Sequence, residues 1–313
     1  MATAKWADLP QLGAPLFLTD GGLETTLVFH FGLDLPDFAA FPLLDTPDGR
    51  DALAQYYSPY FDVAEREGLG IIVDTPTWRA NPDWAARSGY DVAGVAAVNG
   101  RAVAFVRGLA DARSDAVTVV SGAIGPRGDG YVVDATMDSA EAAKYHDVQI
   151  RALADAGADL VTALTMTHVE EAIGIAQAAR ERNVPCVVSF TVETDGKLPS
   201  GTLLADAVRA VDEATDSFPA YYMINCAHPS HFESTVAEDD PSWLRLRGVR
   251  ANASRMSHAE LDVAVELDRG DPTSLALDYQ ALRSMLPGLT VFGGCCGTDH
   301  EHIGAIAAAL MRS

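Results

Sequence analysis

The feature that most constrains the fold is a series of eight short apolar runs at nearly regular intervals. The first and last runs begin at Leu16 and Leu289, so that seven steps average about 39 residues, enough for a strand, a helix and their loops. Such runs are typical of parallel strands that are buried on both faces. The runs are Leu16–Thr19, Gly70–Asp74, Val117–Gly122, Leu160–Leu164, Cys186–Phe190, Tyr221–Asn225, Leu246–Ala251 and Leu289–Phe292.

Helical spacing of apolar residues fills the gaps between these runs, most clearly in Ser139–Ala156, Val169–Arg182 and Leu203–Thr215. Eight alternating units predict an α/β protein with a closed (β/α)8 TIM barrel. No linker or shift in composition divides the chain, so we expect one domain over residues 1–313. The alternative is a doubly wound open sheet, which needs a nucleotide loop that Asp20–Glu24 does not match.

Three polar clusters follow predicted strands. They are Asp20-Gly21-Gly22 after the first run, Asn225-Cys226 at the sixth and Gly293–Thr298 at the eighth. Chemistry in these barrels takes place at the carboxyl ends of the strands. Because strands eight and one are neighbours in a closed barrel and strand six is two away, the clusters are predicted to share one site.

The cysteines indicate metal chemistry. Thiolates of Cys226, Cys295 and Cys296 can surround one zinc ion and leave its fourth position open, as in catalytic zinc sites. From the residues alone, a disulfide between Cys295 and Cys296 or inert core thiols remain alternatives. His228 is either a fourth ligand or a nearby histidine without that role, and Cys186 is predicted to lie in the core.

Composition excludes several classes of protein. A formal net charge of −22 argues against nucleic-acid binding, which requires a basic face. No apolar run reaches the roughly 18 residues of a membrane span, and residues 1–8 do not resemble a signal peptide. Four cysteines do not form a disulfide framework in a chain of 313 residues, so we expect a cytoplasmic protein. The sequence gives no indication of oligomeric state.

Several motifs together resemble the homocysteine S-methyltransferase family, whose members are zinc-dependent barrels that methylate a thiol. The resemblance covers nearly the whole chain and is most specific at the cysteine motifs. The matching segments are Asp20–Thr25, Asp74–Asn81, Gly157–Leu160, Ser189–Gly201, Asn225-Cys226 and Gly293–Thr298.

This resemblance implies an S-methyltransferase with zinc bound by Cys226, Cys295 and Cys296. A methyl group would pass from a cationic donor, a sulfonium or quaternary ammonium compound, to zinc-bound homocysteine or a related thiol, giving methionine or another thioether. The implied partners are therefore a small-molecule thiol and a methyl donor. A zinc hydrolase and a thiol- or metal-binding barrel without methyl transfer are the alternatives.

The resemblance also implies roles for single residues. Asp20 would bind the substrate ammonium, and the N–H groups of Gly21 and Gly22 its carboxylate. Asn225 would orient a zinc ligand or the substrate, and Thr165 would hydrogen-bond the thiol.

One position departs from the family pattern. The glutamate that binds the ammonium at the end of strand four is replaced by Leu164, and losing a charge-assisted hydrogen bond costs roughly 1.5–3 kcal/mol. Weaker use of homocysteine is therefore expected, unless Asp20, Glu24 or Asp74 carries the ammonium.

Aromatic residues follow strands one and two. Trp78 is a candidate for contact with a cationic donor, because aromatic faces attract cations. Packing within the loops is the alternative. The other members of this group are Trp84, Phe29 and Phe31.

Overall fold

The computed structural model describes residues 6, 8–13, 15–113, 116–134, 136–237 and 239–312. Eight parallel strands follow one another in sequence order and close into a barrel, with β1 paired to both β2 and β8. The predicted (β/α)8 barrel is thus confirmed. The strands are β1 Phe17–Leu18, β2 Gly70–Asp74, β3 Thr118–Ile124, β4 Leu160–Met166, β5 Cys186–Phe190, β6 Tyr221–Asn225, β7 Leu246–Ala251 and β8 Val291–Gly294.

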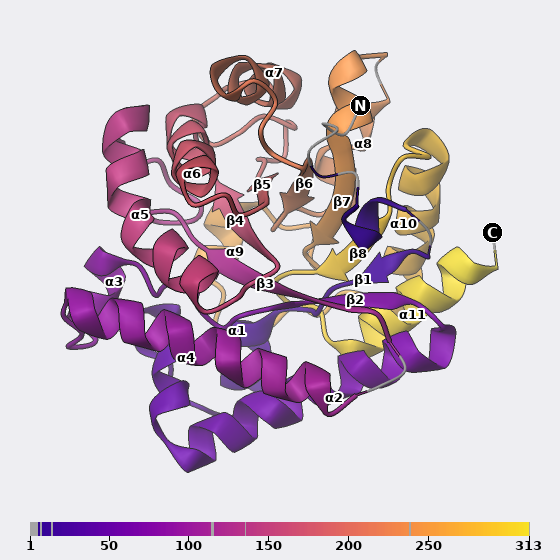
Figure 1. Ribbon diagram of the computed structural model, residues 1–313. Helices are drawn as coiled ribbons and strands as arrows, with labels where there is room; N and C mark the ends of the chain where they lie inside the picture. Colours follow the sequence, from indigo (N-terminus) through magenta and orange to yellow (C-terminus); the bar gives the residue numbers. More distant parts are fainter. Residues whose placement is uncertain are drawn as a thin grey trace.

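Helices surround this barrel, and Figure 1 shows the first long helix, α2, beside the last, α11, where the ring closes. Their ends carry ordinary signals: Thr46 caps α2, and Gly68 ends it with a positive φ of 66°. The helices are α1 Leu23–Thr25, α2 Pro47–Glu67, α3 Pro82–Arg87, α4 Val92–Asp111, α5 Ser139–Asp155, α6 Val169–Glu181, α7 Leu204–Thr215, α8 Glu233–Val236, α9 His258–Asp262, α10 Pro272–Met285 and α11 His300–Met311.

Strand β8 extends past its predicted end because its glycines serve close packing rather than a turn. A Cβ atom on Gly293 would lie 1.8 Å from Thr19 Oγ1, and one on Gly294 would lie 2.0 Å from Thr298 Oγ1. Strand β4 also runs on, through a register shift between Ala163 and Met166. In both cases the additional residues bring the strand end to the barrel mouth.

The barrel interior is apolar toward the amino ends of the strands and polar at their carboxyl ends. Buried side chains such as Phe17, Ile72 and Val187 fill its apolar part. The polar end includes Asp74 on β2 and Arg250 on β7, both almost fully buried. This arrangement places charged groups where apolar packing stops.

Helix α4 has the length and apolar composition of a membrane-crossing helix, although no uninterrupted apolar run of that length is present in the sequence. In the fold its apolar side, including Val98 and Val106, is buried, and the helix contacts β3 and α5. It is therefore an outer helix of the barrel. Residues 1–5 and 7, which bear on the expected lack of a signal peptide, lie outside the described residues.

Candidate functional site

A cavity of about 530 Å³ opens at the carboxyl ends of the strands. It brings together most of the residues predicted for the site, from segments far apart in sequence. The predicted residues that line it are Asp20, Gly21, Gly22, Glu24, Trp78, Leu164, Thr165, Asn225, Cys226, Cys295 and Cys296. Phe31 and His228 are not among the lining residues, and His228 is buried instead against Ser230.

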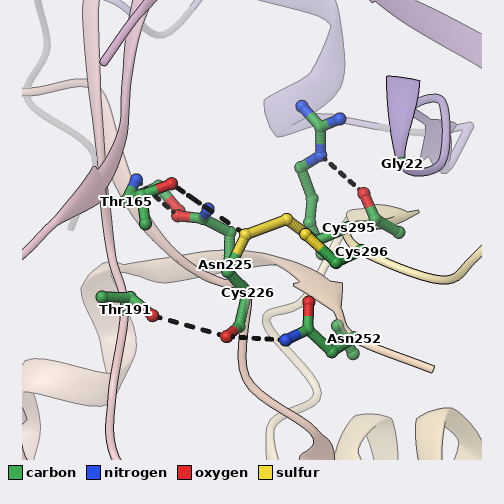
Figure 2. Close-up of a disulfide and its surroundings, with 12 residues drawn as sticks. Gly22, Thr165, Thr191, Asn225, Cys226, Asn252, Cys295 and Cys296 are labelled. Carbon is green, nitrogen blue, oxygen red and sulfur yellow. Dashed lines mark hydrogen bonds between the residues drawn. A yellow bond between two sulfur atoms is a disulfide. The ribbon is translucent and has the colours of Figure 1, made fainter. Parts of the chain in front are cut away.

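The three predicted ligand cysteines meet in this cavity. The sulfur atoms of Cys226, Cys295 and Cys296 all lie within 4.8 Å of one another. Cys226 and Cys295 form a disulfide (Figure 2), whereas Cys296 carries a free thiol. The alternative of a bond between Cys295 and Cys296 is therefore wrong: the disulfide joins the ends of β6 and β8. Cys186 is a buried core thiol, as predicted.

The sulfur cluster fits a zinc ion once the disulfide is reduced. Tetrahedral zinc with bonds of about 2.3 Å to thiolates sets neighbouring sulfur atoms about 3.8 Å apart. The three sulfur atoms here lie within 4.8 Å of one another, so this arrangement requires only the opening of the disulfide and small shifts of the side chains. Three soft donors are also the ligands that zinc accepts. Because the cysteines line the cavity, a fourth ligand can reach the ion from that side.

The backbone of Cys226 is held in an uncommon conformation. Its φ is +55°, which is costly for a residue with a side chain. Its carbonyl oxygen accepts hydrogen bonds from His258 Nε2 at 2.8 Å and from Asn252 Nδ2 at 3.0 Å, the second of which is drawn in Figure 2. These bonds fix the turn that points the thiol at the other two cysteines.

Asn225 connects the ends of three strands. Its Oδ1 accepts from the N–H of Thr165 at 2.9 Å and from Ser189 Oγ at 2.6 Å, while its Nδ2 donates to Thr165 Oγ1 at 2.8 Å (Figure 2). The Thr165 hydroxyl in turn lies 4.0 Å from the sulfur of Cys226. The side chain of Asn225 thus positions Thr165 beside a predicted metal ligand.

One residue near the sulfur atoms, Tyr131, was missed by sequence reasoning. The Tyr131 hydroxyl lies 3.5 Å from the sulfur of Cys296, and its ring stacks on His258 at 4.1 Å. Tyr131 belongs to the loop between β3 and α5. The signal that was available is the length of this loop, which follows a strand end at the barrel mouth.

Arg250 was also missed, and it changes the electrostatics of the site. Its Nη2 donates to Asp20 Oδ1 at 2.5 Å, and its Nη1 donates to Asp74 Oδ2. Tyr56 donates to the other oxygen of Asp20 at 2.9 Å. An arginine inside an apolar strand was itself a signal, because a buried charge requires a partner.

The pairing with Arg250 leaves Asp20 less available to a substrate ammonium than predicted. Burial raises the pKa of the Asp20 carboxyl to about 6, although Arg250 opposes the rise. The expectation for Gly22 needs correction, because its N–H donates to the carbonyl oxygen of Thr298 at 3.0 Å.

Glu24 and Arg79 are two further charged residues that line the cavity. Glu24 has no ion pair within the described residues, and burial raises the pKa of its carboxyl to about 7. The Arg79 guanidinium lies between the rings of Trp78 and Trp84, at 4.1 and 3.8 Å from their centres. Burial lowers the pKa of Arg79 to about 10. Leu164 is buried at the same cavity.

Comparison with known proteins places this site in a family. The homocysteine S-methyltransferase family matches residues 17–310. A homocysteine S-methyltransferase of Escherichia coli is 26% identical over 94% of both chains, and one of Bacillus subtilis, YbgG, is 25% identical over 61% of both. The oxidized crystal form of the Escherichia coli homocysteine methyltransferase MmuM has the same fold, with a TM-score of 0.77, 22% identity and 99% of each chain covered. The chain therefore belongs to the homocysteine S-methyltransferase family and is a methyltransferase.

Proposed function

We propose that the protein transfers a methyl group from a cationic donor to the thiol of homocysteine, giving methionine, in a zinc-dependent reaction. The observation that carries this proposal is the cluster of three cysteine sulfur atoms within 4.8 Å at the barrel mouth. The names of the matching Escherichia coli and Bacillus subtilis proteins support homocysteine as the acceptor. A crystal structure of MmuM is described as metallated, which supports a metal in this fold.

Cys226, Cys295 and Cys296 would hold the zinc. When bound, zinc would lower the pKa of the acceptor thiol, so that the nucleophilic thiolate is present at neutral pH. Asn225, through Thr165, and Asn252, through the carbonyl of Cys226, keep the ligand set in place.

The lining of the cavity supports a positively charged donor. Exposed acids that carry no ion pair within the described residues, Asp262 and Glu266, lie at its rim. The faces of Trp78 and Trp84 that could hold a cation are instead covered by the Arg79 guanidinium. Carboxylates attract a sulfonium or quaternary ammonium group. Such a donor departs as a neutral molecule, so the reaction requires little acid–base help, and the walls contribute mainly by orienting donor and acceptor.

Availability of the three thiols depends on the redox state. The bond between Cys226 and Cys295 must be reduced before all three can bind a metal. A reducing cytoplasm would keep them in that state, and we propose this compartment for the protein.

Methyl transfer with purified protein tests the proposal. Reduced, zinc-loaded protein is incubated with homocysteine and, in turn, S-methylmethionine, S-adenosylmethionine or betaine, and methionine is measured by mass spectrometry. We expect methionine with at least one donor and none from a Cys296→Ser variant. Lack of product with every donor, in protein shown to contain zinc, would overturn the proposed function.

A further inference from the structure

The cavity wall at the end of β4 is apolar, so an acceptor that carries an ammonium group needs an anchor elsewhere in the cavity. Leu164 lines the cavity at the end of β4 and offers only methyl groups. An ammonium group placed against it without a partner would lose its hydration uncompensated. A carboxylate elsewhere in the cavity must therefore bind the amino group if homocysteine is the acceptor.

Asp20 and Asp74 are poorly suited to that task. Both contact the single guanidinium of Arg250, and all three side chains are nearly fully buried. Both carboxylates line the cavity, and Asp74 Oδ1 has no hydrogen-bond partner in the described residues. Recruiting either carboxylate to a substrate would nevertheless weaken its buried ion pair with Arg250. Breaking a buried pair is costly because it leaves a charge without compensation.

Other acids at the cavity are paired or exposed. Asp37 pairs with Arg87 at 2.6 Å, and Asp268 accepts a hydrogen bond from Ser254 at 2.6 Å. Asp129 lies 3.8 Å from Arg79. Asp262 and Glu266 are exposed, where water competes for any ammonium.

Glu24 differs from all of these acids. It follows Asp20-Gly21-Gly22 after one intervening residue, Leu23, lines the cavity and has no ion pair within the described part of the chain. The three cysteines line the same cavity as Glu24. A carboxylate there is placed to meet the polar end of an acceptor whose thiol reaches the cysteines.

Arg79 is the matching cation. Its guanidinium is held in the cavity wall by Trp78 and Trp84 and by a hydrogen bond to the carbonyl oxygen of Gly128 at 2.9 Å. Its Nε is buried and has no hydrogen-bond partner in the described residues. The ion-pair partner of Arg79 within the described residues is Asp129, at 3.8 Å, and not Glu24. Glu24 and Arg79 both line the cavity in which a ligand would bind.

We propose that Glu24 binds the α-ammonium group and Arg79 the α-carboxylate of the acceptor amino acid. This inference rests on the proposed function. An α-amino acid carries its opposite charges on adjacent substituents, as a neighbouring carboxylate and guanidinium require. Specificity for a zwitterionic thiol is thereby transferred from β4 to the loops that follow β1 and β2.

Isothermal titration calorimetry with three ligands, on reduced, zinc-loaded protein, tests the Glu24 contact and the Arg79 contact separately. The ligands are methionine, its deaminated analogue, which keeps only the carboxylate, and its decarboxylated analogue, which keeps only the ammonium. The Glu24→Gln substitution should lower the affinity for methionine and for the decarboxylated analogue by roughly tenfold to a hundredfold. The affinity for the deaminated analogue should stay unchanged. The Arg79→Gln substitution should lower the affinity for methionine and for the deaminated analogue and leave the affinity for the decarboxylated analogue unchanged.

Controls keep the outcome interpretable. Glu181→Gln, at the end of α6, removes one negative charge away from the cavity and should change none of the three affinities. Equal changes for all three ligands in Glu24→Gln, or none, would overturn the inference. Because the wild-type protein is assayed in parallel for methionine formation from homocysteine, this failure is distinct from failure of the proposed function, in which no methionine forms at all.

Discussion

At the scale of single residues, the barrel mouth contains more negative than positive charge close to the sulfur atoms. Arg250 compensates Asp20 and Asp74 together, and Glu24 is left without a cation of its own. Retaining an unpaired carboxylate in a cavity costs stability, and binding sites commonly carry such a cost. Substitution of Glu24 is therefore expected to change the free energy of unfolding as well as the affinity for ligands.

Replacing Glu24 with glutamine should stabilise the ligand-free protein above neutral pH. The folded protein holds this proton up to a pKa of about 7, whereas the unfolded chain releases it near the usual 4.5. The free energy of unfolding therefore falls as pH rises from 4.5 to 7, and the full penalty is present above 7. Denaturant unfolding at pH 8 should show Glu24→Gln more stable by on the order of 1–3 kcal/mol, with little difference at pH 4. A less stable variant at pH 8 would contradict the assigned environment.

Leu164→Glu should improve the affinity for homocysteine by roughly tenfold, because a charge-assisted hydrogen bond to the ammonium is regained. The gain should be larger in a Glu24→Gln background, where the new carboxylate replaces a missing one. Binding of homocysteine in the four combinations of these two substitutions measures this coupling. If the natural protein binds tightly and Leu164→Glu weakens binding in both backgrounds, the interpretation of this position is wrong.

At the scale of elements, strand ends determine where the chemistry lies. Sequence alone predicted the strands because buried parallel strands are apolar throughout, and it predicted the shared mouth because barrel topology orders the strands. It did not identify Tyr131, since the position of a loop side chain depends on tertiary packing that no period reveals. It missed the partners of Arg250 and Gly22 for the same reason, because these contacts join segments far apart in sequence.

The connection between β4, β5 and β6 through Asn225 is expected to matter for the metal. Asn225→Ala removes both hydrogen bonds to Thr165 and leaves the buried N–H of Thr165 without its acceptor. We expect zinc affinity to fall by about tenfold to a hundredfold, as for other residues that orient metal ligands. Competition with a zinc-binding dye measures this change. Ser284→Ala, on α10 far from the sulfur atoms, provides the comparison, and equal affinities in both variants would rule out the positioning role.

At the scale of the whole molecule, the redox state of the cysteines should control metal content. The disulfide removes Cys226 and Cys295 from the ligand set and leaves Cys186 and Cys296 as free thiols. Thiol titration in denaturant should therefore count two thiols per oxidised chain and four after reduction. Zinc should bind at one ion per chain after reduction and not before. Stoichiometric zinc in the oxidised form would disprove binding by all three cysteines.

The short first strand of the barrel connects ligand binding at the mouth with the stability of the barrel closure. Strand β1 spans two residues, yet it closes the ring between β2 and β8. Much of what secures this seam lies just beyond it: Gly294 donates to the carbonyl of Asp20 at 2.9 Å, and Gly22 donates to that of Thr298 at 3.0 Å. The loops that form the site therefore also provide hydrogen bonds that hold β1 against β8. Occupation of the mouth should slow amide hydrogen exchange along β1 and β8 more than along β3, so that the closure itself reports ligand binding.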